Sequence, residues 1–118
     1  MIEEVSGRMF RENKQLQELS LAHNEIQTLP GEHRFRYPRH SSIYSESLFH
    51  TNKNLVHLDL SYNKINHIPK VLFTKTKKLK TLLIGKNKIK VLDKGTFLNP
   101  LLNHVANLFQ KYLKIVLN

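Results

Sequence analysis

One pattern occurs three times in this chain: LQELSLAHNEIQTLP at residues 16–30, LVHLDLSYNKINHIP at 55–69 and LKTLLIGKNKIKVLD at 79–93. Each copy follows the frame L-x-x-L-x-L-x-x-N-x-I-x-x-(L/I), where x is a variable residue. The L-x-L step has the period of two that is typical of a strand with one buried face. Repetition of this kind predicts a solenoid, in which each copy forms one coil and packs against its neighbours.

An asparagine follows the expected strand in every copy, at Asn24, Asn63 and Asn87. The chain has to turn at this point, and a side-chain amide can bond the backbone of the turn. In a stack of coils the same amide can also reach the neighbouring coil. We therefore expect an asparagine ladder inside the solenoid.

Phe10, Phe49 and Phe73 each stand six residues before a copy, on the far side of the coil. With the frame and its I-x-x-L-P-x-x-L-F tail, the chain resembles the leucine-rich repeat family. The tail is similar to the typical extracellular subclass of Toll-like receptors and adhesion receptors. The resemblance implies an α/β-type repeat solenoid, an arc with short parallel strands on its concave face and an irregular convex side.

The resemblance also implies a function. It indicates a non-catalytic fragment of a receptor ectodomain that binds a protein ligand or co-receptor in innate immunity or cell adhesion, on the extracellular side of the membrane. The chain itself has no cysteine, no N-x-S/T glycosylation acceptor, no signal peptide and no apolar run of the ~20 residues that a membrane span needs.

The frame predicts one repeat domain over residues 1–99, with a partial repeat at 1–15 and full frames from 16, 55 and 79. The first step between frames is 39 residues and the second is 24, so residues at about 31–45 form a polar, aperiodic inserted loop. Ile2 and Val5 match the end of a frame whose strand is missing. We expect a fragment of a longer array, or a truncated product without independent function.

The period changes after residue 99. Apolar residues recur every three or four positions between Leu101 and Val116, and Asn99-Pro100 resembles a helix start. This spacing predicts an amphipathic helix over residues 100–118 that caps the last coil. A helix for a membrane surface or a partner is the alternative interpretation.

Charge is divided unevenly along a chain with a net charge of +10. Residues 1–50 hold six basic and seven acidic side chains, whereas residues 51–118 hold thirteen lysines and two aspartates. The lysines form either a solvated face or a polyanion-binding surface for sulfated glycan or nucleic acid. The candidates for that second interpretation are Lys80, Lys86, Lys88 and Lys90.

Partners of such a solenoid are expected on the concave face, where the variable residues of the strands point outward. Tyr62 combines a large area with a polar tip, and Leu83 adds an apolar neighbour. The candidate residues are Glu18, Ser20, His23, His57, Asp59, Tyr62, Thr81, Leu83 and Lys86.

Catalysis has little support in the sequence. The chain lacks H-E-x-x-H, a cysteine nucleophile and a glycine-rich phosphate loop. His23, His57 and Asp59 could form a metal or acid-base group, but surface histidines are the plainer interpretation. We expect no enzyme, no metal and no cofactor.

Overall fold

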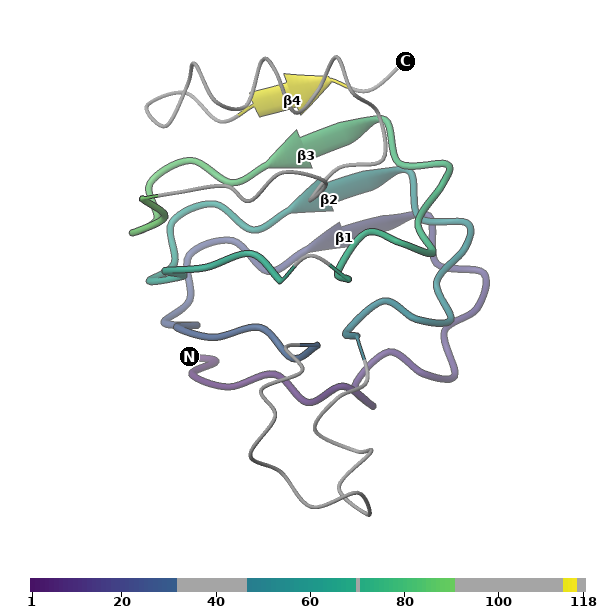
Figure 1. The fold of residues 1–118 in the computed structure, drawn as a ribbon, viewed down its shortest axis with the longest axis horizontal. Coiled ribbons are helices and arrows are strands. Elements are labelled where there is room, and N and C mark those ends of the chain that lie inside the picture. Colours follow the sequence, from purple (N-terminus) through teal and green to yellow (C-terminus); the bar gives the residue numbers. More distant parts are fainter. Residues whose placement is uncertain (32–46, 70, 91–113, 117–118) are drawn as a thin grey trace.

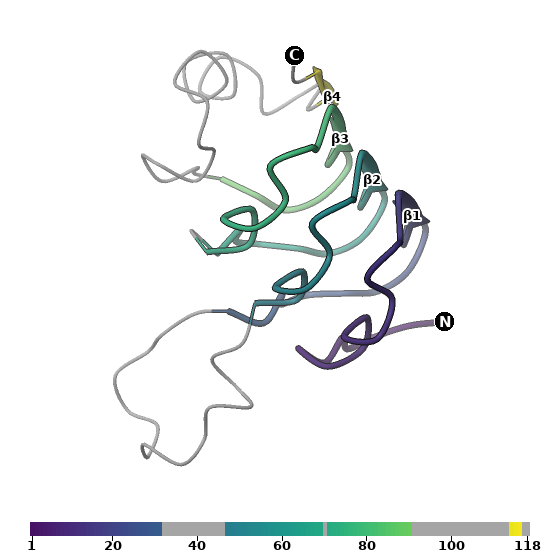
Figure 2. The same cartoon turned by 90° about the vertical axis from the view of Figure 1, so that its right-hand side faces the viewer.

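Four short strands form one sheet in a computed structural model of the chain, which describes residues 1–31, 47–69, 71–90 and 114–116. They are β1 (Glu18–Ser20), β2 (His57–Asp59), β3 (Thr81–Leu83) and β4 (Lys114–Val116), and their order in the sheet is their order in the chain (Figure 1). β1, β2 and β3 run parallel, and one coil of chain separates each from the next (Figure 2). The predicted repeat solenoid is therefore confirmed.

The strand register follows the sequence frame. Leu19 pairs with Leu58, and Leu58 pairs with Leu82, so the central leucines of the three L-x-L steps lie side by side. These leucines point inward because the residues on either side of them alternate to the other face. Leu58 and Leu82 are fully buried, whereas Leu19 at the end of the stack is only partly buried.

The core runs through the coils as one apolar column that is continuous from Val5 to Ile89. Phe49 and Phe73 are buried on the side opposite the sheet, and the ring of Phe10 stacks on Phe49 with centroids 6.2 Å apart. The phenylalanines, which stand six residues before each copy of the frame, thus fill the side of the coil opposite the sheet. No helix occurs in the part of the chain that the structure describes, so the back of each described coil consists of turns.

The expected asparagine ladder is confirmed. The Asn63 side-chain oxygen accepts a hydrogen bond from the N–H of Ile26 at 3.1 Å, and its amide donates to the carbonyl of Leu21 at 2.9 Å. Both partners belong to the preceding coil. Asn87 bonds the second coil in the same way, and Asn24 accepts from the N-terminal residues. Asn63 and Asn87 therefore satisfy buried or partly buried backbone groups of the preceding coil, whereas the bond from Ile2 to Asn24 is exposed.

The residue before each asparagine has a left-handed backbone. The φ angles are 59° at His23, 55° at Tyr62 and 58° at Lys86. Such a conformation costs a residue with a side chain about 1–2 kcal/mol. It appears at one frame position in all three coils, where it turns the chain sharply at the end of the strand. The same strained backbone conformation therefore recurs in each of the three repeats.

The C-terminal helix predicted over residues 100–118 is wrong for Lys114–Val116, which form β4 and pair antiparallel with β3. Two β-branched residues, Ile115 and Val116, favour a strand, and a strand at this place covers backbone groups that β3 would otherwise expose. Pairing with the edge of β3 therefore decides the structure of these three residues, although the sequence around them has the spacing of a helix. The remainder of the predicted helix, residues 100–113 and 117–118, lies outside the described residues.

The inserted segment leaves and rejoins the coil at one place. A Cβ built on Gly31 would lie 3.3 Å from the Cα of Ser47, so the two residues that flank the undescribed stretch 32–46 are direct neighbours. Gly31 has a φ of +119°, a conformation that favours glycine. After Ser47 the chain resumes the frame with Leu48 and Phe49, both buried.

Candidate protein-binding face

The sheet has an open face, defined here by the nine residues predicted for the concave side. These residues belong to β1, β2, β3 and the turns that follow them, and each is exposed or partly exposed. Strand pairing aligns them in columns across the coils: Glu18, His57 and Thr81; Ser20, Asp59 and Leu83; His23, Tyr62 and Lys86. The sequence-predicted residues thus lie together on one surface.

Two aromatic rings stack at one border of the open face. The rings of His23 and Tyr62 have centroids 4.3 Å apart and planes 12° from parallel. Tyr62 remains 50% exposed, more than any phenylalanine among the described residues. The frame aligned these residues in one column, but their stacking depends on the left-handed turns, which the sequence pattern does not reveal. The stack is an exposed aromatic platform, and exposed aromatic residues contribute strongly to protein interfaces.

The acidic group at the centre of the open face is held by its own turn. A carboxylate oxygen of Asp59 accepts hydrogen bonds from the N–H of Ser61 at 2.9 Å and from its hydroxyl at 2.6 Å. Ser20 makes the corresponding bond to the N–H of Ala22 at 3.3 Å. Within the described residues, no group of three or more potential metal ligands is present. Asp59 therefore serves the local backbone in this structure, and the open face is a contact surface of mixed polarity.

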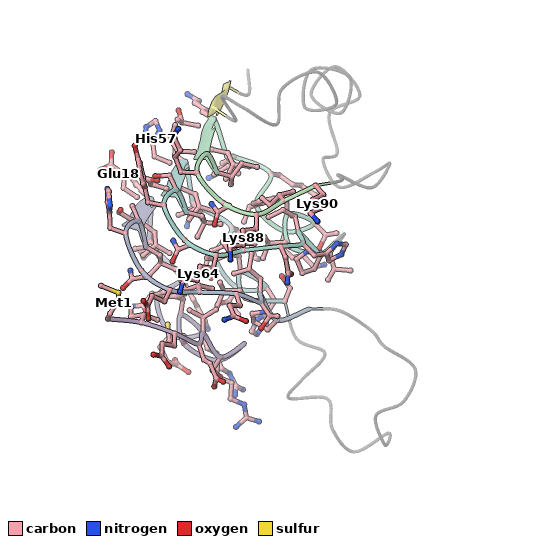
Figure 3. All side chains as sticks on the ribbon, turned by 90° about the vertical axis from the view of Figure 1, so that its left-hand side faces the viewer. Met1, Glu18, His57, Lys64, Lys88 and Lys90 are labelled. Atoms are coloured by element: carbon pink, nitrogen blue, oxygen red, sulfur yellow. The ribbon has the colours of Figure 1, made fainter. Side chains whose placement is uncertain are left out.

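The four lysines of the alternative interpretation do not lie in one place. Lys80 precedes β3, whereas Lys86, Lys88 and Lys90 follow it. Lys86, Lys88 and Lys90 are exposed, whereas Asn87 between them bonds the second coil and Ile89 is buried. Figure 3 shows Lys88 and Lys90 on one side of the coils.

A lysine of the second coil adjoins this side. Lys64 occupies the same frame position as Lys88 and lies near it in Figure 3. Its ammonium group stands 3.8 Å from the carboxylate of Glu25 in the first coil. From residue 60 to residue 90 the chain contains no acidic residue. The net charge of the repeated frame therefore rises along the sequence, from −2 in residues 16–30 through 0 in residues 55–69 to +3 in residues 79–93.

A second set of inter-coil contacts was missed by the sequence analysis. The buried amide of Asn52 donates to the carbonyls of Phe10 at 3.1 Å and Asn13 at 2.8 Å, on the side opposite the sheet. Asn54 adds a bond to the carbonyl of Lys14 at 3.1 Å. The available signal was the spacing F-x-x-N, which occurs at both Phe10 and Phe49. These contacts fix the coils to one another and so fix the columns of the open face.

Comparison with protein-family models gives two matches, both described as leucine-rich repeat. One covers residues 53–105, which include β2 and β3, and the other covers residues 12–28, which include β1. Together the two matches cover more than half of the chain. No curated protein matches it.

The matches agree with the coils that the structure shows. Leucine-rich repeats are generally non-catalytic modules that bind protein partners. Among the described residues, no helix is long and apolar enough to cross a membrane. From its repeated frame, its parallel strands and both family matches, we conclude that this chain belongs to the leucine-rich repeat family.

Proposed function

We propose that the chain binds a protein partner through the open face, with the His23–Tyr62 stack as the main contact. The stack carries the proposal because it joins a half-exposed tyrosine to a second ring at 4.3 Å, and a partly ordered ring loses little entropy on binding. Leu83 supplies a partly exposed apolar side chain on the same face, and the polar residues around it form a rim.

The class of partner is proposed to be extracellular. The I-x-x-L-P-x-x-L-F tail resembles that of Toll-like and adhesion-receptor ectodomains, and the described backs of the coils are turns and contain no helix. We therefore place the chain in a receptor ectodomain with a role in innate immunity or cell adhesion. Its ligand or co-receptor is a protein that contacts the tyrosine.

The test is a binding screen of the chain against an array of secreted proteins and receptor ectodomains, with cytosolic proteins as a comparison set. For each protein that binds, Tyr62→Ala should weaken binding at least about tenfold, a typical effect for a central aromatic contact. Lys75→Ala is the matched control, because Lys75 is exposed and lies outside the open face. Equal affinity of wild type and Tyr62→Ala would contradict the assignment of the stack.

A second candidate function is polyanion binding, for which we propose the row formed by Lys86, Lys88 and Lys90. The exposure of all three lysines and the absence of acidic residues between residues 60 and 90 of the sequence support this function. Lys80, at the other end of β3, would have a smaller effect. A sulfated glycan that follows this row would bind in a salt-dependent manner.

Retention on a heparin column tests the second candidate. Changing Lys86, Lys88 and Lys90 together to Glu should lower the salt concentration of elution much more than changing Lys75, Lys77 and Lys78 to Glu. Both triple variants change the net charge by the same amount, so the comparison separates a located site from general attraction. Equal loss in the two variants would exclude a site at the row.

A further inference from the structure

The open face carries charges of opposite sign in the first and the third coil. The first coil contributes Glu18, which is exposed (Figure 3). The second coil adds Asp59, whose carboxylate is partly exposed. In the third coil Lys86 belongs to the face, and Lys80 stands directly before β3; both lysines are exposed. The acidic groups therefore lie in the first two coils, and the basic groups lie in the third.

The charges at the two ends of this face have no partner within the described part of the chain. The ion pair between Glu25 and Lys64, at 3.8 Å, lies outside the nine residues of the face. Among the described residues, neither Glu18, Lys80 nor Lys86 takes part in an ion pair. β4, which pairs with β3, adds a lysine and no acidic residue to the sheet. A partner with complementary charges can therefore pair with both ends.

The polarity runs across the strands and not along them. Lys80 and Lys86 stand on either side of β3, so both ends of that strand have the same sign. The sign changes only from coil to coil. Tyr62, which is 50% exposed, belongs to the second coil, and Leu83 of β3 is partly exposed and pairs with Asp59. A partner element that crosses the strands thus meets an acidic group, then the aromatic and apolar groups, and then basic groups.

The spacing of the strands favours a helix as this element. Neighbouring strands lie about 4.8 Å apart, so β1 and β3 are separated by about 10 Å. Residues seven apart in an α-helix are separated by about 10.5 Å along its axis and lie on the same side. An extended segment spans that distance in about three residues, but residues three apart in a strand point to opposite sides. One face of a helix can therefore contact both ends of the open face.

We propose that the protein partner of the open face presents an amphipathic α-helix that lies along the solenoid axis. Its contacting side carries a basic residue at position i for Glu18, apolar residues at i+3 and i+4 for the His23–Tyr62 stack, and an acidic residue at i+7 for Lys80 or Lys86. The inference rests on the proposed function, because it describes the partner of the same face. The two opposite charges fix the direction of the helix, since reversal would bring like charges together.

The probes are three stapled helical peptides that share leucine at i+3 and i+4 and differ only at positions i and i+7. The K/E peptide has lysine at i and glutamate at i+7, the K/K peptide has two lysines, and the E/E peptide has two glutamates. NMR titration of the full chain at low ionic strength, followed at Tyr62 and Leu83, gives the three dissociation constants.

The order of the three affinities separates a polar face from general attraction. The net charge of +10 alone would make the E/E peptide bind most tightly and the K/K peptide least tightly. The proposal instead expects the K/E peptide to bind about threefold or more tighter than either of the others, because the E/E peptide brings a glutamate to Glu18. The order set by net charge would overturn the proposal. So would the absence of any shift at Tyr62 with about 1 mM K/E peptide.

Charge reversal in the chain should exchange the preference among the peptides. The double variant Lys80→Glu, Lys86→Glu should bind the K/K peptide most tightly. The matched control is Lys75→Glu, Lys77→Glu, which changes the net charge by the same amount at two exposed residues outside the open face. The control should still bind the K/E peptide most tightly. The same preference in both double variants would contradict a contact with the third-coil lysines.

Tyr62→Ala distinguishes this inference from the proposed function. The variant should weaken binding of all three peptides by a similar factor and leave their order unchanged. If the order follows net charge while Tyr62→Ala still weakens binding of a protein partner, the His23–Tyr62 stack remains the main contact and the polar helix is overturned. If the K/E peptide binds most tightly but binds Tyr62→Ala like wild type, the charge pattern is supported and the stack is not the main contact.

Discussion

The first and second coils have almost the same frame but different surroundings. Leu58 in the second coil is 1% exposed because coils lie on both sides of it, whereas Leu19 in the first coil is partly exposed. Leucine at this frame position therefore contributes more to stability in the second coil than in the first. Burial in a solenoid is therefore set by the neighbouring coils more than by the residue's own coil.

Substitutions in the core should lower the stability most. Leu58→Ala should lower the free energy of unfolding by about 2–5 kcal/mol, because it opens a cavity between two coils. Leu19→Ala should cost only about 1–2 kcal/mol, because less of its surface is buried to begin with. Urea titration followed by circular dichroism measures both. Equal losses would mean that the first coil is covered in solution.

The next effect concerns the asparagine ladder. Asn63→Ala should lower the free energy of unfolding by about 2–3 kcal/mol, because the N–H of Ile26 loses its acceptor in a buried place and the carbonyl of Leu21 keeps only its bond from Asn24. Asn24→Ala should cost about 1 kcal/mol, because water can replace its bond to Ile2 near the surface. Chemical denaturation measures the loss in free energy of unfolding for both variants. Equal losses would show that burial of the asparagine does not matter.

A smaller effect should follow from deletion of residues 32–46. Gly31 would then join Ser47, which is already its neighbour, and the step from Leu16 to Leu55 would become 24 residues, as in the next repeat. The folded coil should persist, and the free energy of unfolding should rise by about 1 kcal/mol because a shorter loop costs less entropy to close. Thermal unfolding compares the two chains. A deleted chain that does not fold would show that the segment contributes to the core.

The smallest effect concerns the left-handed position in the third coil. Lys86→Gly should raise the free energy of unfolding by about 0.5 kcal/mol, because glycine adopts a positive φ without strain. Lys88→Gly is the matched control, since Lys88 lies two residues away and is not among the left-handed residues. The control should lose about 0.5–1 kcal/mol through added freedom in the unfolded chain. A lower free energy of unfolding in both variants would contradict strain at Lys86.

Much of the fold could be predicted from the sequence because the frame is local and repeated. The L-x-L steps located β1, β2 and β3, and the recurring asparagines predicted the ladder before any contact was known. The open face followed from the same frame, since alternate residues of a strand point to opposite sides. The residues that make up the face were therefore identified, whereas their partner depends on variable side chains that the frame does not constrain.

The remaining features depend on contacts between segments that no local pattern records. Residues 114–116 belong to a segment with helical spacing, but the edge of β3 offers backbone partners that only a strand can use. The His23–Tyr62 stack requires two left-handed turns at adjacent coils. Asn52 belongs to the back of the coil, outside the frame that the sequence analysis followed.

The asparagine ladder also has a mechanical consequence. Each rung joins the backbones of two adjacent coils, so a force that pulls the ends of the solenoid apart loads the rungs in series. Under tension we therefore expect the coils to separate one rung at a time, so that the stack lengthens in steps of about one repeat.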